Sequence, residues 1–393
     1  MQDATKHFIN GQWVNSIDGR ETAVENPSTE ERIATITLGG VADVEMAVTA
    51  AKDAFPSWAA TNPSERIAAL ERLMEVYKTR AGDMAQAISI EMGAPIALAK
   101  TAQVGAGAGH LKNTIRAAKT FVFESPLGDH APGDIILYEP VGVCALITPW
   151  NWPMNQVMLK VAPALAAGCT MILKPSELSP LSSILLAEMI DEADFPPGTF
   201  NLVNGDGANV GAHLTSHEDV DMVSFTGSTR AGVAITKSAA DTVKRVSLEL
   251  GGKGANIIFA DADEKVITRG VRHCFNNSGQ SCNAPTRMLV ERTIYDQAVE
   301  TARAVAEKTE VGPADIEGRH IGPVVSEVQF NKIQFLIKRG MDEGAKLIAG
   351  GLGRPDGLSR GYFVRPTIFA DVTQDMTIWK EEIFGPVLCI TPF

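Results

Sequence analysis

The sequence of 393 residues is poor in cysteine and contains only five thiols. They are Cys144, Cys169, Cys274, Cys282 and Cys389. No two of them form a Cys-x-x-Cys pair, and the set does not fit an even disulfide framework. Free thiols are typical of a reducing compartment, so the composition predicts a cytoplasmic protein.

Long apolar runs are also absent. The longest, such as residues 141–149, fall well short of the ~20 residues that a membrane helix requires. Residues 1–10 contain no basic segment followed by an apolar one, so no secretory signal is expected. Acidic residues outnumber basic ones by 47 to 35, and the resulting net charge of -12 argues against a nucleic-acid or anionic membrane partner.

The sequence shows no obvious set of metal ligands. Its seven histidines are scattered, and no group of His, Cys or carboxylate residues has the spacing of a metal site. His273 belongs to a predicted helix, and no histidine is placed to activate a cysteine. The pattern argues against a zinc enzyme and a Cys-His hydrolase, and no metal is expected.

The length and the order of the predicted elements indicate an α/β protein with two domains. Between residues 140 and 250, apolar strands alternate with helices, which predicts a parallel sheet covered on both faces. Together with residues 1–118, this part is predicted to be a doubly wound, Rossmann-like nucleotide-binding domain. Residues 251–393 predict a second α/β domain. Residues 119–139 predict a β-hairpin that either pairs with another subunit or covers its own domain.

Ligands of such sheets bind beyond the carboxyl ends of the strands. The polar or small residues that follow predicted strands are Asn151, Lys174, Glu177, Thr226, Gly227, Ser228 and Glu249. The segment from Gly227 to Gly232 opens a helix, and its N–H groups suit a pyrophosphate, although a simple turn fits equally well. Gly205-Asp206-Gly207 lacks the fingerprint spacing and is interpreted as a strand-to-helix turn. Lys174 and Glu177 could contact a ribose, where an acid favours NAD over NADP.

Two of these residues fit acid–base and oxyanion chemistry. Glu249 lies between Leu248 and Leu250, where desolvation would raise its pKa and suit a general base; the alternative is a strand-end acid paired with Lys253. Asn151 could direct its amide at a developing oxyanion. Taken alone, however, its position favours a helix N-cap.

Cys282 lies in a loop of small and polar residues, Asn277 to Pro285, that follows a predicted helix. The small neighbours leave the thiol open to a substrate, and the polar ones deprive it of the apolar cover of an inert core cysteine. Because most free cysteines are buried hydrophobes, the loop alone is weak support. The strand-end residues upstream make a nucleophile the better hypothesis.

Taken together, these segments resemble the aldehyde dehydrogenase superfamily along essentially the whole chain. The matching motifs, in the order of the family, are Pro149-Trp150-Asn151, Lys174-Pro175-Ser176-Glu177, Phe225-Thr226-Gly227-Ser228, Glu249-Leu250-Gly251-Gly252-Lys253, Gly279-Gln280-Ser281-Cys282 with Arg287, and Glu381-Glu382-Ile383-Phe384-Gly385-Pro386. Each motif is moderately specific, and six in sequence are highly specific.

The resemblance implies an NAD-dependent enzyme that oxidises an aldehyde to the acid, with NADP as an alternative cofactor. It implies Cys282 as the nucleophile of a thiohemiacetal and a thioester, Asn151 with the Cys282 N–H as the oxyanion holder, and Glu249 as the base that activates water. An intact Glu249 argues against the CoA-acylating branch. The implied cofactor-binding residues are Trp150, Lys174, Ser176, Glu177, Gly207, Phe225, Thr226, Gly227, Ser228, Leu250, Gly251, Glu382 and Phe384.

The family pattern continues beyond Phe393, so the catalytic domain is expected to be incomplete at its C-terminus. An aldehyde pocket is expected around Met154, Met158, Ser281 and Asn283, and the expected assembly is a homodimer or homotetramer. Two alternatives to an active dehydrogenase remain: a catalytically silent protein that retains the fold, and a thiol esterase that uses Cys282 without NAD.

Overall fold

The computed structural model describes residues 3–393, which divide into two compact units. The first unit comprises the described residues up to Val24 together with Ala34–Ala87 and Lys100–Glu249. The second comprises Glu25–Ile33, Ile88–Ala99 and Leu250–Phe393. The two short segments of the second unit therefore come from the N-terminal part of the chain. The assignment of one unit to cofactor binding and the other to catalysis stays a prediction.

A seven-stranded sheet forms the centre of the first unit, in the order β11-β10-β7-β8-β9-β1-β2. The strands from β10 to β9 in this order pair in parallel, as predicted. β7 and β8 are buried at every position, which fits strands covered on both faces. The N-terminal strands β1 and β2 extend the sheet in antiparallel fashion beyond β9. The strands are β1 (Lys6–Ile9), β2 (Gln12–Asn15), β7 (Val143–Ile147), β8 (Thr170–Lys174), β9 (Phe200–Leu202), β10 (Met222–Gly227) and β11 (Arg245–Leu250).

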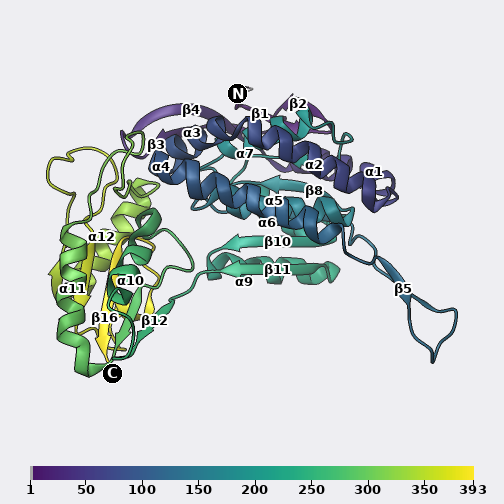
Figure 1. The fold of residues 1–393 in the computed structure, drawn as a ribbon. Helices are drawn as coiled ribbons and strands as arrows, with labels where there is room; N and C mark the ends of the chain where they lie inside the picture. The colour runs from purple at the N-terminus through teal and green to yellow at the C-terminus, as the bar shows by residue number, and fades with distance from the viewer. Residues whose placement is uncertain (1–2) are drawn as a thin grey trace. The chain divides into compact units, whose positions relative to one another are not determined.

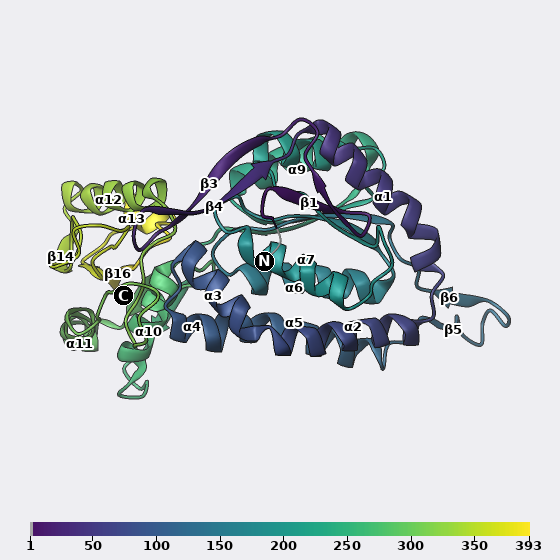
Figure 2. The same cartoon turned by 90° about the horizontal axis from the view of Figure 1, so that it is seen from above.

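Helices cover both faces of this sheet, so the first unit is doubly wound (Figures 1 and 2). Helices α1 and α9 lie on one face, and α6 and α7 on the other, with α2 and α5 as an outer layer. Helix α2 begins as its sequence predicts, since Pro63 occupies the first turn and the Asn62 N–H donates to Glu65 Oε2 at 2.9 Å. The helical segments are α1 (Val41–Ala59), α2 (Pro63–Thr79), α3 (Ala81–Met92), α4 (Ile96–Leu98), η1 (Ala99–Gln103), α5 (Val104–Ala118), α6 (Pro153–Ala167), α7 (Leu181–Glu192), η2 (Gly207–Gly211), α8 (Ala212–Ser216), α9 (Thr229–Ala239) and η3 (Ala240–Thr242).

The hairpin expected in residues 119–139 is present as β5 (Glu124–Pro126) and β6 (Ile135–Leu137), which pair in antiparallel fashion. It extends away from the helices of its own unit (Figure 1). The side chains of Ile135, Leu137 and Tyr138 are each more than half exposed. The alternative in which the hairpin covers its own domain is therefore wrong.

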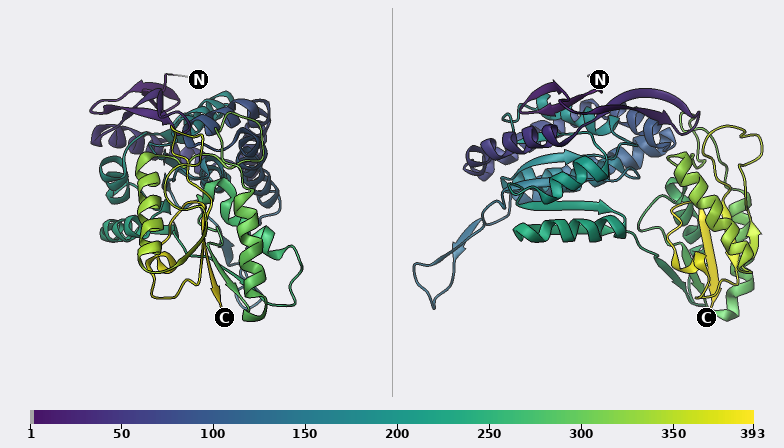
Figure 3. Two further views of the ribbon diagram at one scale, coloured as in Figure 1. Left: turned by 90° about the vertical axis from the view of Figure 1, so that its left-hand side faces the viewer. Right: turned by 180° about the vertical axis from the view of Figure 1, so that it is seen from behind.

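The second unit is built on a five-stranded sheet in the order β12-β13-β16-β15-β14, in which only the edge strand β14 runs antiparallel. Residues of α10 and α11 pack on one face of this sheet, and those of α12 pack on the other (Figure 3). The elements are β12 (Ala255–Ile258), α10 (Val266–Phe275), η4 (Asn276–Gly279), β13 (Arg287–Val290), η5 (Arg292–Ile294), α11 (Tyr295–Glu307), α12 (Glu327–Asp342), β14 (Lys346–Ala349), β15 (Thr367–Ala370), α13 (Thr377–Lys380) and β16 (Val387–Pro392). Strands β3 (Arg20–Asn26) and β4 (Glu31–Leu38) form a separate ribbon. Within residues 3–393, no helix is both long and apolar enough to span a bilayer.

Candidate active site

The carboxyl ends of β10, β7, β8 and β9 lie at one edge of the first unit's sheet, because these strands are parallel. The chain winds from β7 outward to β9 and then returns to β10 on the other side of β7. Ligands of doubly wound sheets bind beyond the carboxyl ends of the strands at such a reversal. Asn151 follows β7 and Lys174 ends β8, so the fold brings these two predicted residues to this edge of the sheet.

Lys174 connects two loops at this edge. Its Nζ donates to the carbonyl oxygens of Pro175 at 2.8 Å and Gly205 at 2.6 Å, and it lies 3.8 Å from Glu177 Oε2. Burial lowers the pKa of Lys174, an effect that the Glu177 and Asp206 carboxylates oppose. The Ser176 hydroxyl accepts from the Leu178 N–H at 3.3 Å, and the Glu177 side chain is 40% exposed. The Glu177 carboxylate is therefore accessible to a ribose.

The segment after β10 combines a tight backbone approach with an unsatisfied hydroxyl. A Cβ at Gly227 would collide with the ring of Phe225, so a larger residue there would require this ring to move. The Thr226 hydroxyl is buried and has no hydrogen-bond partner among residues 3–393. Ser228 caps α9, since its Oγ accepts from the Ala231 N–H at 3.3 Å. Gly207, by contrast, is exposed in the turn η2, which Asp206 caps.

Asn151 does not cap the helix that follows it. The N-cap position of α6 is Trp152, whose side chain makes no cap hydrogen bond. Asn151 is instead 3% exposed, and its carbonyl oxygen accepts from Gln103 Nε2 at 3.3 Å. The N-cap interpretation is therefore wrong, and the oxyanion role is the one that stays a prediction.

Glu249 is exposed, so its expected desolvation between two leucines is wrong. Successive side chains of a strand point to opposite faces, and the carboxylate of a residue in β11 therefore does not share the surroundings of Leu248 and Leu250. Lys253, the other partner considered for Glu249, makes no hydrogen bond through its ammonium within residues 3–393. Burial lowers the pKa of Lys253.

Lys160 interacts electrostatically with Glu249. It is not among the site residues predicted from the sequence. Lys160 lies on α6, is 5% exposed, and donates from Nζ to Ser224 Oγ at 3.0 Å. Burial lowers its pKa from 10.5 to about 8, while the Glu249 charge acts in the opposite direction. The signal in the sequence was a lysine on the apolar face of a helix, between Val157 and Val161.

Replacing Lys160 with methionine should stabilise the protein at neutral pH. The folded state gives up the lysine proton near pH 8, whereas the unfolded chain holds it to about 10.5, so wild-type stability rises with pH across this window. At about 1.4 kcal/mol per pKa unit, the buried charge of Lys160 lowers the free energy of unfolding by at most about 3 kcal/mol. Urea unfolding between pH 7 and 10.5 measures the free energy of unfolding of both proteins. If this free energy rises with pH equally steeply in the variant, the expectation is contradicted.

Cys282 lies in the second unit and is exposed, whereas the other four cysteines of the chain are buried. The loop before it is held rigidly by buried residues. Ser278 Oγ donates to the Gly322 carbonyl at 2.7 Å, and the Val325 N–H donates to Gln280 Oε1 at 2.9 Å. The expectation of an exposed thiol on a supported loop is confirmed, and its role as a nucleophile stays a prediction.

The backbone before Cys282 requires glycine at position 279. Asn277, Ser278 and Gly279 all have positive φ, and a Cβ on Gly279 would collide with the Gly385 carbonyl. We expect Gly279→Ala to lower the free energy of unfolding by about 2 to 4 kcal/mol, since it combines strain with overlap. Gly105→Ala, on α5 with no atom near its Cβ, is the matched control and should be neutral or stabilising. Equal stability of the two variants in urea would contradict this account.

Glu382 approaches the segment that contains Gly251 and Gly252. Its Oε1 accepts from the Gly252 N–H at 3.2 Å, and a Cβ on Gly251 would collide with the same carboxylate. A Cβ at Gly252 would lie 3.8 Å from the Cys282 carbonyl oxygen. Burial raises the pKa of Glu382, an effect that the Gly252 N–H and two lysines oppose. The second unit thus brings Gly251, Glu382 and the Cys282 backbone together.

Phe384 lies in the same loop in a left-handed conformation, with φ of 59°. Gln329 of α12 holds the loop, because its Nε2 donates to the carbonyl oxygens of Ile383 at 3.1 Å and Phe384 at 2.7 Å. A non-glycine residue held at positive φ by its surroundings is a feature of functional loops.

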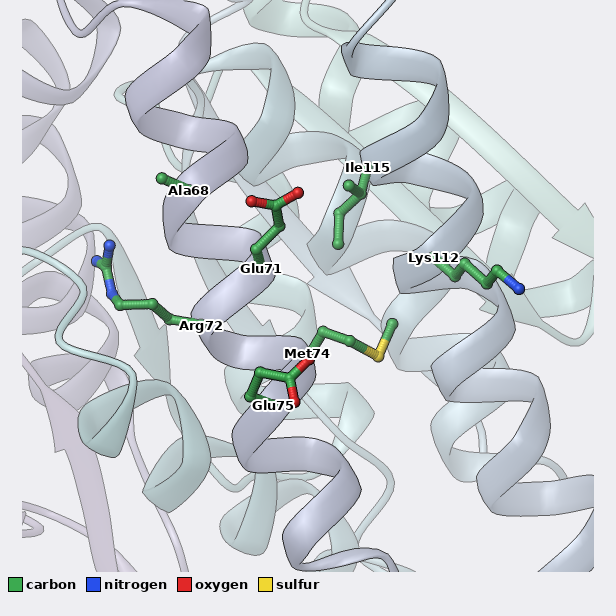
Figure 4. Close-up of a pocket in the computed structure, with 7 residues that line it drawn as sticks. All are labelled: Ala68, Glu71, Arg72, Met74, Glu75, Lys112 and Ile115. Carbon is green, nitrogen blue, oxygen red and sulfur yellow. The ribbon is translucent and has the colours of Figure 1, made fainter.

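Two of the residues expected around the aldehyde pocket do not line a surface. Met154 and Met158 are both 0% exposed, because their i, i+4 spacing places them on the core face of α6. A concave surface of the first unit, about 560 Å³, lies between α2 and α5 (Figure 4). One of its carboxylates, Glu71, pairs with Lys119 at 2.6 Å, and the surface contains none of the predicted site residues.

Comparisons with known proteins agree on one family. Residues 13–393 match the model of the aldehyde dehydrogenase family. The chain is 51% identical to a 3-succinoylsemialdehyde-pyridine dehydrogenase of a Pseudomonas species, over 100% of this chain and 82% of that protein. It is 58% identical to an aldehyde dehydrogenase of Bartonella henselae, with a TM-score of 0.99 and coverage of 100% and 83%. A mutant of aldehyde dehydrogenase C of Pseudomonas syringae, solved with NAD⁺ and octanal, is 46% identical, with a TM-score of 0.97 and coverage of 100% and 80%.

Proposed function

The chain belongs to the aldehyde dehydrogenase family, and we propose that it oxidises an aldehyde to the carboxylic acid through a covalent intermediate on Cys282, with NAD as the hydride acceptor. The observation that carries the proposal is the exposed thiol on a rigid loop of the second unit. A thiolate needs access to its substrate and a fixed direction of attack, and this loop supplies both.

We propose the following chemistry for the chain's own residues. The Cys282 thiolate adds to the aldehyde carbon, and the carbonyl oxygen becomes an oxyanion. The Asn151 amide and the Cys282 N–H would donate to that oxygen. Once the carbon has lost its hydride, it is a thioester. Glu249 takes a proton from water, the hydroxide adds to the thioester, the C–S bond breaks, and the acid leaves with the thiolate regenerated.

The exposure of Glu249 is compatible with this role, since a base must reach water. Lys160 acts through Glu249 rather than on the substrate. Its buried ammonium interacts electrostatically with the Glu249 carboxylate, the group proposed to take the proton. Lys160 is therefore a positioning residue.

Features of the first unit suit a dinucleotide. The buried Thr226 hydroxyl has no partner among residues 3–393, and together with the N-terminus of α9 beside it, it suits a pyrophosphate. NAD, when bound, supplies the acceptor for the hydride. Glu177 favours NAD over NADP by repelling a 2′-phosphate. The residues proposed to hold it are Trp150, Lys174, Ser176, Glu177, Gly207, Phe225, Thr226, Gly227 and Ser228 in the first unit, and Leu250, Gly251, Glu382 and Phe384 in the second.

A panel of aldehydes with NAD and with NADP, followed by the absorbance of the reduced cofactor, tests the proposed function. We expect reduction of NAD with at least one aldehyde and formation of the matching acid. Nicotinamide binding with no turnover on any aldehyde would favour the catalytically silent protein. Hydrolysis of esters without cofactor reduction would favour the thiol esterase.

We also propose a homodimer or homotetramer assembled through the hairpin of β5 and β6. An isolated two-stranded ribbon is only marginally stable, and this one exposes apolar side chains. The double change Ile135→Lys and Leu137→Lys should give a smaller assembly in light scattering, whereas Asp129→Ala, in the same hairpin, should not. A monomeric wild type, or an unchanged mass in the double variant, would contradict the proposal.

For the location, we propose the cytoplasm. All five cysteines are free thiols, including the exposed Cys282. An exposed free thiol persists in a reducing compartment and is readily oxidised outside it. Recovery of the protein in the cytoplasmic fraction after cell fractionation is the expected result, and recovery in another fraction would contradict it.

A further inference from the structure

We propose that Glu45, His213 and His217 form a binding site for a divalent transition-metal ion of the zinc type. Glu45 lies on α1, His213 lies within α8, and His217 ends α8. One potential ligand atom from each residue lies within 4.8 Å of the others. All three residues belong to the first unit, and none is among the proposed catalytic or cofactor-binding residues.

The geometry is close to that of a coordinated ion. His213 Nε2 lies 2.6 Å from Glu45 Oε1, and His217 Nε2 lies 3.3 Å from Glu45 Oε2. Ligand atoms about 2.0 to 2.1 Å from a tetrahedral ion are on the order of 3.4 Å apart. Small side-chain movements would therefore open the space for an ion.

The ligand types select the class of ion. Two imidazoles and one carboxylate suit zinc and similar transition metals, whereas magnesium and calcium prefer oxygen ligands alone. The i, i+4 spacing of His213 and His217 places both rings on one side of α8, where they meet edge to face at 5.7 Å between centroids. Three protein ligands leave the remaining coordination positions to water.

Binding requires a change of tautomer in both rings. Without metal, each Nε2–H donates to Glu45, and the Asp219 N–H donates to His217 Nδ1 at 3.1 Å. When Nε2 coordinates the ion, the ring proton must lie on Nδ1. His217 must then give up its bond from Asp219, whereas His213 Nδ1 accepts no hydrogen bond within residues 3–393. A substitution of His213 therefore distinguishes a metal site from a hydrogen-bonded cluster more clearly than a substitution of His217 does.

The ion would connect two helices that are far apart in the sequence. Glu45 and His213 are separated by 168 positions, so coordination joins α1 to α8 only when the unit is folded. An ion that binds the folded but not the unfolded state raises the midpoint of thermal unfolding. This readout is independent of dehydrogenase activity.

The experiment is a titration of ZnCl₂ by isothermal calorimetry, with unfolding midpoints measured in parallel. The background is Cys282→Ala, because the exposed thiol would itself bind zinc. We expect one ion per chain at this site and a raised midpoint. Adding His213→Ala should weaken binding by roughly 10- to 100-fold and remove the midpoint shift. Glu45→Gln keeps a hydrogen-bonding side chain, removes the charge and should also weaken binding.

His110→Ala serves as the matched control, since His110 lies on α5 and bonds Asn155 instead. Its zinc affinity should equal that of the background. His213 and Glu45 are partly exposed at 29% and 52%, so both variants are expected to fold. Zinc binding that survives both His213→Ala and Glu45→Gln, or the absence of binding in the background, would overturn the proposal whether or not the protein is an active dehydrogenase.

Discussion

Replacing Cys282 with alanine should lower aldehyde-dependent NADH formation by at least about 10⁴-fold, because the proposed nucleophile is lost. The side chain is exposed, so its removal creates no cavity in the core of the second unit. NAD affinity, measured by nicotinamide fluorescence, should remain at the wild-type level. The steady-state assay and the titration are done on the same preparation.

Full activity in Cys282→Ala would contradict the proposed mechanism. The other four thiols do not offer a substitute, since all are buried. Burial raises the pKa of Cys274 to about 12 and that of Cys389 in the same direction, which disfavours the thiolate form at either position. Loss of NAD binding together with activity would instead indicate that the second unit had been disturbed.

Replacing Glu249 with glutamine should separate the two halves of the reaction. The amide cannot take a proton from water, so release of the acid should slow by roughly 10²- to 10⁴-fold. The first half of the proposed mechanism does not use this carboxylate, and we expect a rapid burst of about one NADH per active site before the slow phase. Stopped-flow absorbance resolves the burst from the steady state.

The matched control is Glu264→Gln, which removes one exposed carboxylate from the second unit. This control should keep the wild-type steady-state rate. An unchanged rate in Glu249→Gln would remove the residue from its proposed role. A slow rate without a burst would place its action before the thioester.

Local patterns in the sequence predicted much of the fold. Apolar strands alternating with helices predicted a parallel sheet, and β10, β7, β8 and β9 do pair in parallel. Pro63 after a capping residue predicted the start of α2. These features depend on neighbours in the chain, so a single sequence contains them.

Features that depend on distant contacts were not predicted. Residues 25–33 and 88–99 join the second unit through contacts such as the hydrogen bond from the Ile96 N–H to the Ala314 carbonyl, at 2.7 Å. The spacing of apolar residues also did not show which face of α6 packs in the core. Met154 was therefore expected at the aldehyde pocket, but it is buried. The pair of His213 and His217 was visible at i, i+4, but Glu45 reaches it only through the fold.

At the candidate site, the sequence predicted some residue environments correctly and others wrongly. Cys282 is exposed as expected, since small residues surround it in the loop. Glu249 was expected to be desolvated by its neighbours in sequence, yet strand geometry turns its side chain away from theirs. Lys160 was overlooked because a lysine within an apolar helix carries no motif. Environment follows from packing in three dimensions, and a linear pattern does not contain it.

The most direct test is to trap the acyl group. Glu249→Gln is mixed with NAD and the best aldehyde of the panel, quenched in acid, digested and analysed by mass spectrometry. If Cys282 and Glu249 act in one reaction, the peptide containing Cys282 gains one acyl group in the presence of NAD and none without it. An acyl group on another residue, or no acylation despite NADH formation, would contradict the account.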